Sequence, residues 1–320
     1  MKTQDTYAFG LDFGTNSCRS LLVNLQTGEE VATSVFEYPS GDLGIIVDSK
    51  DVHIARQNPQ DYIDGVKRII KDALVQAHSN DKFDANQVIS IGIDTTGSTP
   101  IPLDELCVPL SLNSKFSNNI NALAWLWKDH SSIEEAKTIT ETANKIRPEY
   151  LNKCGGTYSS EWFWSKLWRL SKVDTEVYNA MGSFVELCDY LPAMLTGIKD
   201  TKAIKRSQCA AGHKAMFNKQ WNGLPDSEFL NALDNNLSDS LNKLYTETYT
   251  SDQSAGTLCN ELAKELGLSE DVVISIGAFD AHVGAVGSGI RPGTMVKIMG
   301  TSTCDIIISP ESQPLKDIPG

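Results

Sequence analysis

The chain has 320 residues, of which 41% are hydrophobic and 22% are charged, a composition that excludes a disordered, collagen-like or coiled-coil protein. With 28 Lys and Arg against 41 Asp and Glu, the net charge of -13 argues against nucleic acid as a partner, because it would repel phosphates. The seven cysteines are odd in number and include no CxxC pair, which excludes a disulfide framework and suits a reducing cytoplasm.

The N-terminal part of the chain predicts an antiparallel ribbon of strands. Residues 1–6 are polar and no run of about eighteen apolar residues occurs, so we expect a soluble, cytoplasmic protein without membrane contact. Two tight turns then separate three stretches rich in strand-forming residues. These predicted strands span residues 7–13, 17–24 and 30–38.

A helix and a central strand are expected next. Asn58 suits an N-cap and Pro59 the first helical position, and apolar residues recur on one helical face up to about residue 78. The apolar run at 88–94 ends in polar residues, which is typical of a buried strand whose carboxyl end opens on a site.

The rest of the chain mixes helical and strand patterns and therefore predicts an α/β fold. Helices are expected near residues 131–143, 160–170, 226–233 and 254–266. Two strands, at 272–276 and 294–299, flank a stretch of small residues at 277–289 that we expect to be helical.

A short internal repeat becomes visible when the chain is shifted by 286 residues. Both copies read as a strand, a Gly-Thr-polar-Ser/Thr turn and a second strand. The turns comprise Gly14, Thr15 and Asn16 in the first copy, and Gly300, Thr301 and Ser302 in the second. Such a turn offers backbone N–H groups and hydroxyls that suit a phosphate oxygen. A polar hairpin turn without a ligand is the alternative for a single copy, whereas two copies favour a nucleotide clamp.

Two aspartates occupy positions that suit phosphate chemistry. Asp280 follows a strand and a short turn, so we expect it at the carboxyl edge of a sheet, where sites of α/β proteins lie. A carboxylate there can accept the proton of an attacking hydroxyl, and a helix N-cap is its alternative role. Asp12 precedes the first turn and would face Mg²⁺ or its waters, with a strand-end cap as the alternative.

Two common kinds of site are excluded by the absence of their motifs. The five histidines do not have metal-ligand spacing such as HExxH, which makes a zinc site improbable. The GxxxxGK[ST] pattern is also absent, so the chain is not a P-loop enzyme.

Paired phosphate turns, one in each lobe, resemble the architecture of actin, hexokinase and the Hsp70 ATPase. Within that superfamily the sequence resembles the FGGY carbohydrate kinases along its whole length, and among them most closely the ribulokinase group. The resemblance rests on GLDFGTNSCRSLLV (10–23), IGIDTTGST (91–99), WLWKDH (125–130), GGTYSSEWFWSKLWRL (155–170), AAGHK (210–214) and GAFDAHVGAVGSGIRPGTMVKIMGTSTC (277–304). It implies an actin-like ATPase (ribonuclease H-like) lobe with an antiparallel strand meander and a mixed sheet flanked by helices.

The resemblance also implies roles for individual residues. Asp280 matches the aspartate that is the general base in the family. The residues implied to contact the sugar are Asp280, Thr96, Gly97, Trp125, Glu161 and Lys214. Those implied to hold the nucleotide phosphates are Gly14, Thr15, Asn16, Gly300, Thr301 and Ser302, with Asp12 facing Mg²⁺ directly or through its waters. From the residues alone, Trp125 could merely pack, Lys214 could be solvated and Gly97 could be a bare turn glycine.

The implied activity is a phosphoryl transfer from ATP to L-ribulose, giving L-ribulose 5-phosphate in arabinose catabolism, and a homodimer is compatible with it. A sibling kinase for xylulose, D-ribulose or ribitol would keep Asp280 and both turns. A noncatalytic, actin-class nucleotide-binding protein is the rival from another class, and it would have no need of Asp280.

The second turn bears on domain organisation, because it should open a second lobe. We expect residues 1–290 to form the sugar-binding N-terminal lobe and residues 291–320 to form the first hairpin of a C-terminal nucleotide-binding lobe. Since family members carry further residues that supply the adenine pocket, we expect the chain to be part of a longer kinase, with little or no activity by itself.

Overall fold

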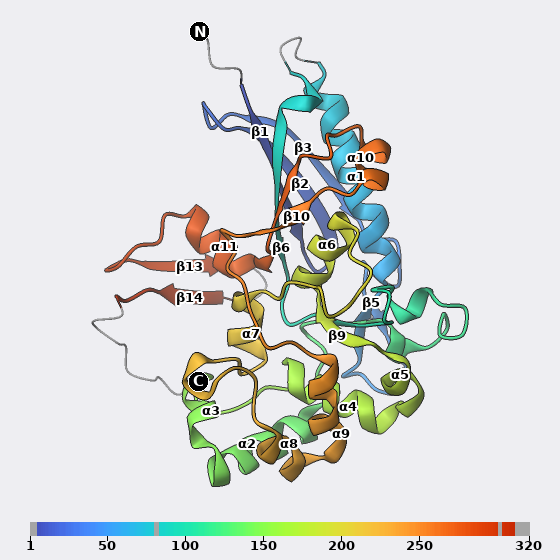
Figure 1. The fold of residues 1–320 in the computed structure, drawn as a ribbon, viewed down its shortest axis with the longest axis vertical. Helices are drawn as coiled ribbons and strands as arrows, with labels where there is room; N and C mark the ends of the chain where they lie inside the picture. The colour runs from blue at the N-terminus through green and yellow to red at the C-terminus, as the bar shows by residue number, and fades with distance from the viewer. Residues whose placement is uncertain (1–4, 80–82, 300–302, 311–320) are drawn as a thin grey trace.

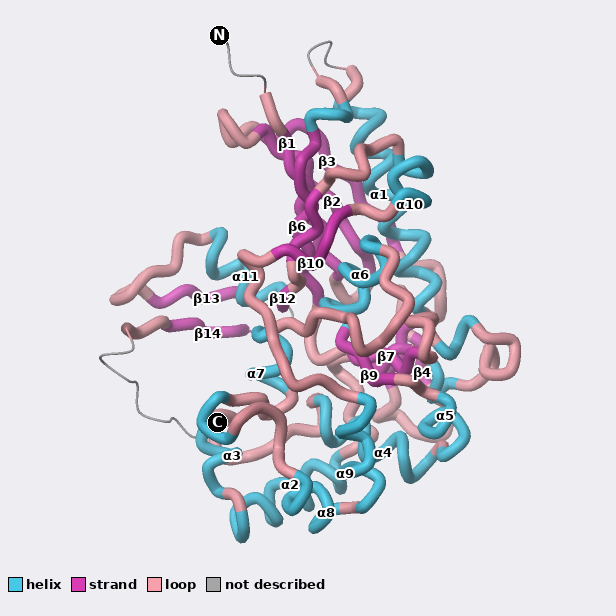
Figure 2. Tube along the Cα trace, viewed as in Figure 1, coloured by secondary structure: helices cyan, strands magenta, loops and turns pink. Residues whose placement is uncertain are grey.

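The computed structural model describes residues 5–79, 83–299 and 303–310, and its elements gather in two regions (Figure 1). The upper region in this view is built on a mixed sheet, and the lower region is a cluster of short helices (Figure 2). Three helices lie along one face of the sheet: α1 (Pro59–Ala77), α6 (Leu187–Thr196) and α10 (Asn260–Leu266).

The main sheet consists of β1 (Tyr7–Phe13), β2 (Ser17–Asn24), β3 (Glu30–Glu37), β6 (Val88–Thr95), β10 (Ser254–Thr257), β11 (Val273–Ser275) and β12 (Ala278–Phe279). The strand order is β10-β11-β6-β1-β2-β3, and β12 also pairs with β6. The first three strands are antiparallel, which confirms the predicted ribbon, whereas β6 runs parallel to β1. This pairing places Asp12 opposite Asp94 at the carboxyl ends of the two strands.

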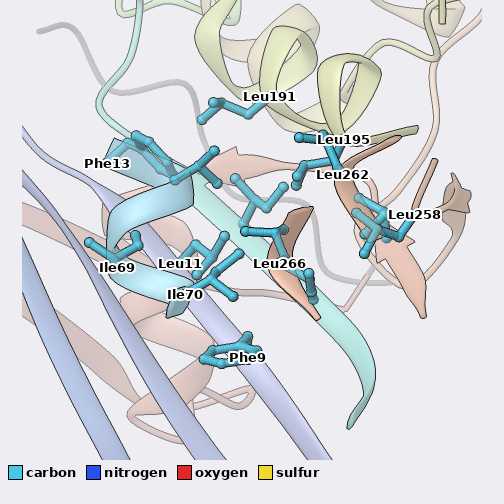
Figure 3. Close-up of a cluster of buried hydrophobic side chains, with 14 of the residues drawn as sticks. Phe9, Leu11, Phe13, Ile69, Ile70, Leu191, Leu195, Leu258, Leu262 and Leu266 are labelled. Atoms are coloured by element: carbon cyan, nitrogen blue, oxygen red, sulfur yellow. The ribbon is translucent and has the colours of Figure 1, made fainter. Parts of the chain in front are cut away.

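The two faces of β1 differ because its side chains alternate between them. Phe9, Leu11 and Phe13 are buried against apolar side chains of α1, α6 and α10 (Figure 3). Burial of each such side chain stabilises the fold by about 1.5–3 kcal/mol relative to exposure. Gly10 and Asp12 point to the other face and are less buried, so this face remains available for polar chemistry.

Helix α1 begins as the sequence predicts. The Asn58 side chain accepts a hydrogen bond from the N–H of Gln60, and Pro59 occupies the first helical position. Gly65 lets the helix approach β2 closely, since a Cβ there would lie 2.5 Å from Sγ of Cys18. An alanine at this position would therefore force the Cys18 side chain or α1 itself to shift.

The helical region has its own aromatic core, to which Tyr150, Phe163 and Trp164 belong. Its helices are α2 (Ile133–Ile146), α3 (Pro148–Asn152), α4 (Phe163–Val173), α5 (Thr175–Ala180), α8 (Ser227–Leu233) and α9 (Asn235–Ser240). Two small sheets join the regions: β4 (Ile46–Val47), β5 (Ala55–Gln57) and β8 (Ala124–Trp125) form one, and β7 (Pro100–Leu103) and β9 (Ser183–Glu186) form the other. Within the described residues, no helix is both long enough and apolar enough to cross a membrane.

The last described elements lie on the side of the sheet opposite α1 and α10 (Figure 1). They are α11 (Asp280–Gly287), β13 (Met295–Met299) and β14 (Thr303–Ile307), and α7 (Gln208–Lys214) contacts β12 beside them. β13 and β14 pair as an antiparallel hairpin. The predicted phosphate turn between them, Gly300, Thr301 and Ser302, lies outside the described residues.

The α/β class is confirmed, but the predicted helix at 254–266 is wrong in its first half. Residues 254–257 form β10, which pairs with β11, and the helix starts only at Asn260. Gly256 has φ +154°, a backbone conformation that residues other than glycine rarely adopt. Because helical residues have negative φ, a helix cannot include Gly256. The stretch at 277–289 is likewise extended at Ala278 and helical only from Asp280 to Gly287.

Candidate active site

A cavity of about 390 Å³ opens at the carboxyl ends of β1 and β6, beside the start of α11. It is lined by Asp12, Gly14, Thr15, Arg19, Thr96, Gly97, Trp127, Asp280, Ala281, Ile298 and Cys304. The cavity therefore brings Asp280 together with Asp12 and the first turn, which lie far from it in the sequence and were predicted to share a site with it.

Asp12, which lines the cavity, lies opposite Asp94 on the neighbouring strand, and a hydrogen bond joins their carboxyl groups. The pKa of Asp94 is raised to about 8. Burial is the largest cause, and the charge of Asp12 and a hydrogen bond to Asp12 contribute to the same shift. At neutral pH, the carboxyl group of Asp94 is therefore largely protonated. Nε of Arg19 lies 3.1 Å from Oδ2 of Asp12, a pairing that follows from the hairpin register.

We expect the stability of an Asp94→Asn variant, relative to wild type, to increase with pH. The pKa of Asp94 rises from 3.8 to about 8 on folding, so its contribution to stability is fully present below about pH 4 and is lost as the pH approaches 8. Asparagine cannot ionise, so the variant does not lose this stability as the pH rises. Thermal unfolding from about pH 5 to about pH 9 measures the difference in Tm, with Asp72→Asn on the surface of α1 as the control. A pH-independent difference would contradict this account.

Asp280 is the first residue of α11, directly after β12. β12 pairs in parallel with the end of β6, which places Phe279 opposite Thr95 and brings Asp280 to the cavity. The surrounding protein removes water from the carboxyl group and raises its pKa, while a hydrogen bond from the N–H of Ala281 lowers it. A carboxylate whose pKa is raised is a stronger base, which suits proton abstraction from a hydroxyl.

Gly97 forms a second wall of the cavity, next to Thr96. The N–H of Thr96 donates to the carbonyl of Phe13, which fixes this segment to the end of β1. A Cβ on Gly97 would lie 1.9 Å from Cε1 of Phe279, because the phenyl ring covers this glycine. Gly97 thus has a packing reason that the sequence did not reveal: it makes room for the residue that precedes Asp280.

The first predicted phosphate turn is anchored by groups from outside the hairpin. The side chain of Gln57 donates to the carbonyl of Thr15 at 2.7 Å, and Nε1 of Trp127 donates to the Thr15 hydroxyl at 3.0 Å. Gly14 and Thr15 line the cavity, whereas the Asn16 side chain donates to the carbonyl of Leu43. A turn held in this way can present its backbone to a phosphate with little reorganisation.

Lys214 and Glu161 lie near the site without being part of the cavity lining. The ammonium of Lys214 is 4.9 Å from the centroid of the Trp162 ring and 6.0 Å from that of Phe279. Burial lowers the pKa of Lys214, and the charge of Glu161 opposes this shift. Lys214 therefore lies close to Phe279, the residue before Asp280, and Glu161 is the acidic residue whose charge affects the pKa of Lys214 most.

Trp125, which was expected to contact the sugar, does not line the cavity, because its side chain is 0% exposed. The guanidinium of Arg56 lies 3.5 Å from the centroid of the Trp125 ring, and the indole N–H donates to the carbonyl of Asn121. Trp127, two residues later, lines the cavity instead. Nothing in the WLW sequence distinguishes a buried tryptophan from one in a cavity wall.

Some cavity residues were missed by the sequence analysis. Arg19 could have been found, because a hairpin that turns at residues 14–16 places it opposite Asp12. Ile298 and Cys304 come from the β13–β14 hairpin and gave no signal of their own.

A magnesium site in the cavity would depend on its carboxylates. Within residues 5–79, 83–299 and 303–310, no group of three or more His, Cys, Asp or Glu is arranged to hold a metal ion. Mg²⁺ normally needs only one or two carboxylates, because waters and substrate phosphates supply its other ligands. Asp12, next to the Gly14 turn, fits that requirement.

Comparison with protein families decides between the candidate classes. The model for the N-terminal domain of the FGGY family of carbohydrate kinases matches residues 7–287. The chain belongs to the FGGY family of carbohydrate kinases. This match confirms the resemblance found in the motifs. It also excludes the alternative that the chain is an actin-class protein outside this family.

Curated relatives extend over almost all of this FGGY chain. A ribulokinase of Vibrio parahaemolyticus is 42% identical over 318 residues, which cover 99% of the chain and 55% of the relative. A ribulokinase of Shouchella clausii is 35% identical over 320 residues, covering 98% of the chain and 55% of the relative. The FGGY chain thus spans about half the length of the curated relatives it matches.

Solved structures share the fold at low sequence identity. A xylulose kinase from Rhodospirillum rubrum has a TM-score of 0.72 at 18% identity, covering 94% of this FGGY chain and 55% of the other. Glycerol kinase of Plasmodium falciparum with ADP also has a TM-score of 0.72, at 13% identity, covering 93% and 53%. At such identities the likeness concerns the fold alone, and it confirms the fold class.

Proposed function

We propose that this chain forms the sugar-binding part of an ATP-dependent L-ribulose kinase. The observation that carries the proposal is the cavity in which Asp280 meets Asp12 and the Gly14 turn. A base and a phosphate turn in one cavity suit transfer of a phosphoryl group to an alcohol. The ribulokinase relatives, at 42% and 35% identity, support L-ribulose as that alcohol.

In the proposed reaction, Asp280 accepts the proton of the terminal hydroxyl of L-ribulose. The hydroxyl oxygen forms a bond to the γ-phosphorus of ATP as the bond from that phosphorus to the bridging oxygen breaks, and ADP leaves with the electron pair. Asp12 would hold Mg²⁺ together with the phosphates, and the ion would neutralise their charge. Gly14 and Thr15 position the phosphates by backbone contacts, with Asn16 beside them.

The other assigned residues are divided between the sugar and the second lobe. Thr96, Gly97, Lys214 and Glu161 are assigned to the sugar side, near Phe279 and Asp280. Gly300, Thr301 and Ser302 are assigned to the phosphates on the strength of the sequence repeat alone. The domain boundary belongs to the same proposal, with residues 1–290 as the sugar lobe and residues 291–320 as the start of the nucleotide lobe.

The proposal includes a cellular setting. L-Ribulose 5-phosphate is a product expected in arabinose catabolism, and we assign the enzyme to the cytoplasm. All seven cysteines are free thiols in the structure, which is the state that a reducing compartment maintains.

The direct test is an ADP-release assay on the complete gene product with a panel of sugars. We expect kcat/KM to be highest for L-ribulose and lower by about tenfold or more for D-ribulose, D-xylulose and ribitol, because misplaced hydroxyls leave buried polar groups unpaired. A preference for D-xylulose would favour the sibling kinase, whose fold the Rhodospirillum rubrum structure shares. Absence of sugar-dependent ADP release from every sugar would refute the kinase proposal.

A further inference from the structure

Lys166, near the start of helix α4, has a wholly buried ammonium group with 0% of the residue exposed. Its Nζ donates to the carbonyl oxygens of Ser98 at 2.8 Å, Leu126 at 2.8 Å and Trp125 at 3.3 Å. An ammonium has three N–H donors, so these three carbonyls use its whole capacity. A buried charge is costly unless it is satisfied in this way, which indicates that the arrangement is specific.

The three carbonyls belong to two segments that meet at the cavity. Ser98 follows Gly97 directly, and Leu126 precedes Trp127, and both Gly97 and Trp127 line the cavity. Lys166 does not line the cavity, so it can influence a ligand only through the two backbones that it joins. The ammonium thus acts as a clamp between the two cavity walls.

Glu186, the last residue of β9, completes the clamp from the other side. Its carboxylate accepts hydrogen bonds from the Ser98 hydroxyl and from the N–H of Thr99, the latter at 2.8 Å. Burial lowers the pKa of Lys166, and the charge of Glu186 is the strongest one that raises it. The weaker charge of Glu161 also raises this pKa, whereas those of Arg56 and Lys214 lower it. Burial raises the pKa of Glu186, and the Ser98 hydroxyl and the Lys166 ammonium oppose this shift.

We infer that Lys166 and Glu186 are positioning residues that fix the Gly97 wall of the cavity relative to the Trp127 wall. The inference rests on the proposed function, since it concerns the site assigned to the sugar. The spacing of the two walls, and with it the fit of the sugar, is then set by a buried ammonium that does not touch the substrate. Loss of that ammonium should weaken sugar binding more than nucleotide binding, because Gln57 holds the backbone carbonyl of Thr15 in the phosphate turn, whereas Trp127 reaches only the Thr15 hydroxyl.

The test compares Lys166→Met with Lys172→Met in the complete gene product. Lys172 lies on the same helix, but its ammonium contacts Glu135 at 3.0 Å and the Trp168 ring, so it is a matched loss of one ammonium elsewhere. In the ADP-release assay, Lys166→Met should raise KM for L-ribulose about tenfold or more and leave KM for ATP within about twofold. Lys172→Met should change neither. An unchanged KM for L-ribulose in Lys166→Met would overturn the inference.

Hydrogen exchange provides a readout that needs no ligand. The N–H groups of Thr99 and Leu126 donate to Glu186 and to the carbonyl of Ala55 in the wild type. In Lys166→Met, both should exchange about tenfold faster or more, while amides of α1 keep their wild-type rates. Uniform acceleration across the chain would indicate a global stability effect and would overturn the inference.

Two further variants keep the test decisive. Lys166→Arg retains the charge, but a planar guanidinium cannot direct three N–H groups at these three carbonyls, so it should not restore KM. Full restoration by arginine would contradict the geometric argument. If Lys166→Met does not fold, Glu186→Gln should give faster exchange at Thr99, and wild-type exchange there would count against the clamp. If the wild type releases no ADP with any sugar, the kinase proposal fails, while the exchange data still decide the clamp.

Discussion

Replacing Asp280 with asparagine should lower kcat for phosphoryl transfer by about 100- to 10,000-fold, the contribution typical of a general base. Asparagine has nearly the same shape but cannot accept the proton of the sugar hydroxyl. The carboxylate already accepts a hydrogen bond from the N–H of Ala281, and the amide oxygen of asparagine can do the same, so the fold should persist. The measurements are ADP release with saturating sugar and ATP, and Tm by thermal unfolding.

Asp72→Asn is the matched control for this prediction. Asp72 pairs with Arg68 on the surface of α1, remote from the cavity, so its replacement should leave kcat unchanged. Because Asp280 must be ionised to act as a base, and because its pKa is raised, the activity of the wild type should fall as the pH drops through a range above that of an ordinary carboxyl group. Near-normal turnover by Asp280→Asn would remove Asp280 from the proposed reaction.

The second large effect is expected from Gly97→Ala. The new methyl group would lie 1.9 Å from Cε1 of Phe279, so the phenyl ring or the Gly97 backbone must move. Phe279 is bonded to Asp280, and a displacement of about 1 Å at a catalytic group costs about a hundredfold in rate. We therefore expect kcat to drop by about tenfold to a hundredfold, and overpacking to lower the stability by about 1–3 kcal/mol.

Gly10→Ala is the control, because it adds the same methyl group to β1 with nothing within 4 Å of it. The double variant Gly97→Ala with Phe279→Leu should recover part of the lost kcat, since leucine leaves room where the phenyl edge lay. Equal kcat values for Gly97→Ala and wild type would show that Phe279 can yield without moving Asp280.

Local sequence signals were sufficient for the elements whose cause is local. The helix cap at Asn58 and the hairpin that joins β1 to β2 depend on neighbouring residues, and both were predicted at nearly their true positions. The helix predicted at 254–266 failed because the backbone of Gly256 follows the pairing of β10 with β11 rather than the helical periodicity of its sequence.

The site itself could be predicted only where a residue type implied its chemistry. Asp12 and Asp280 are carboxylates at strand ends, and the structure brings both to one cavity. Trp125 and Trp127 could not be separated, because the burial of Trp125 depends on Arg56, which comes from a different strand. Lys166 gave no signal at all, since a lysine on a helix is ordinarily solvated and its three carbonyl partners lie in segments distant in sequence.

The pairing of Thr95 has a consequence for the order of folding. This last residue of β6 lies opposite Phe13 on one side and opposite Phe279 on the other. The hairpins of β1, β2 and β3 can form as soon as those residues have been synthesised, but β12 joins β6 only after a long intervening stretch has folded or been looped out. Closure over such separations costs entropy and slows assembly. Pairing of β12 with β6, which brings Asp280 to the cavity, should therefore occur late in refolding, after most of the helical circular dichroism has been regained.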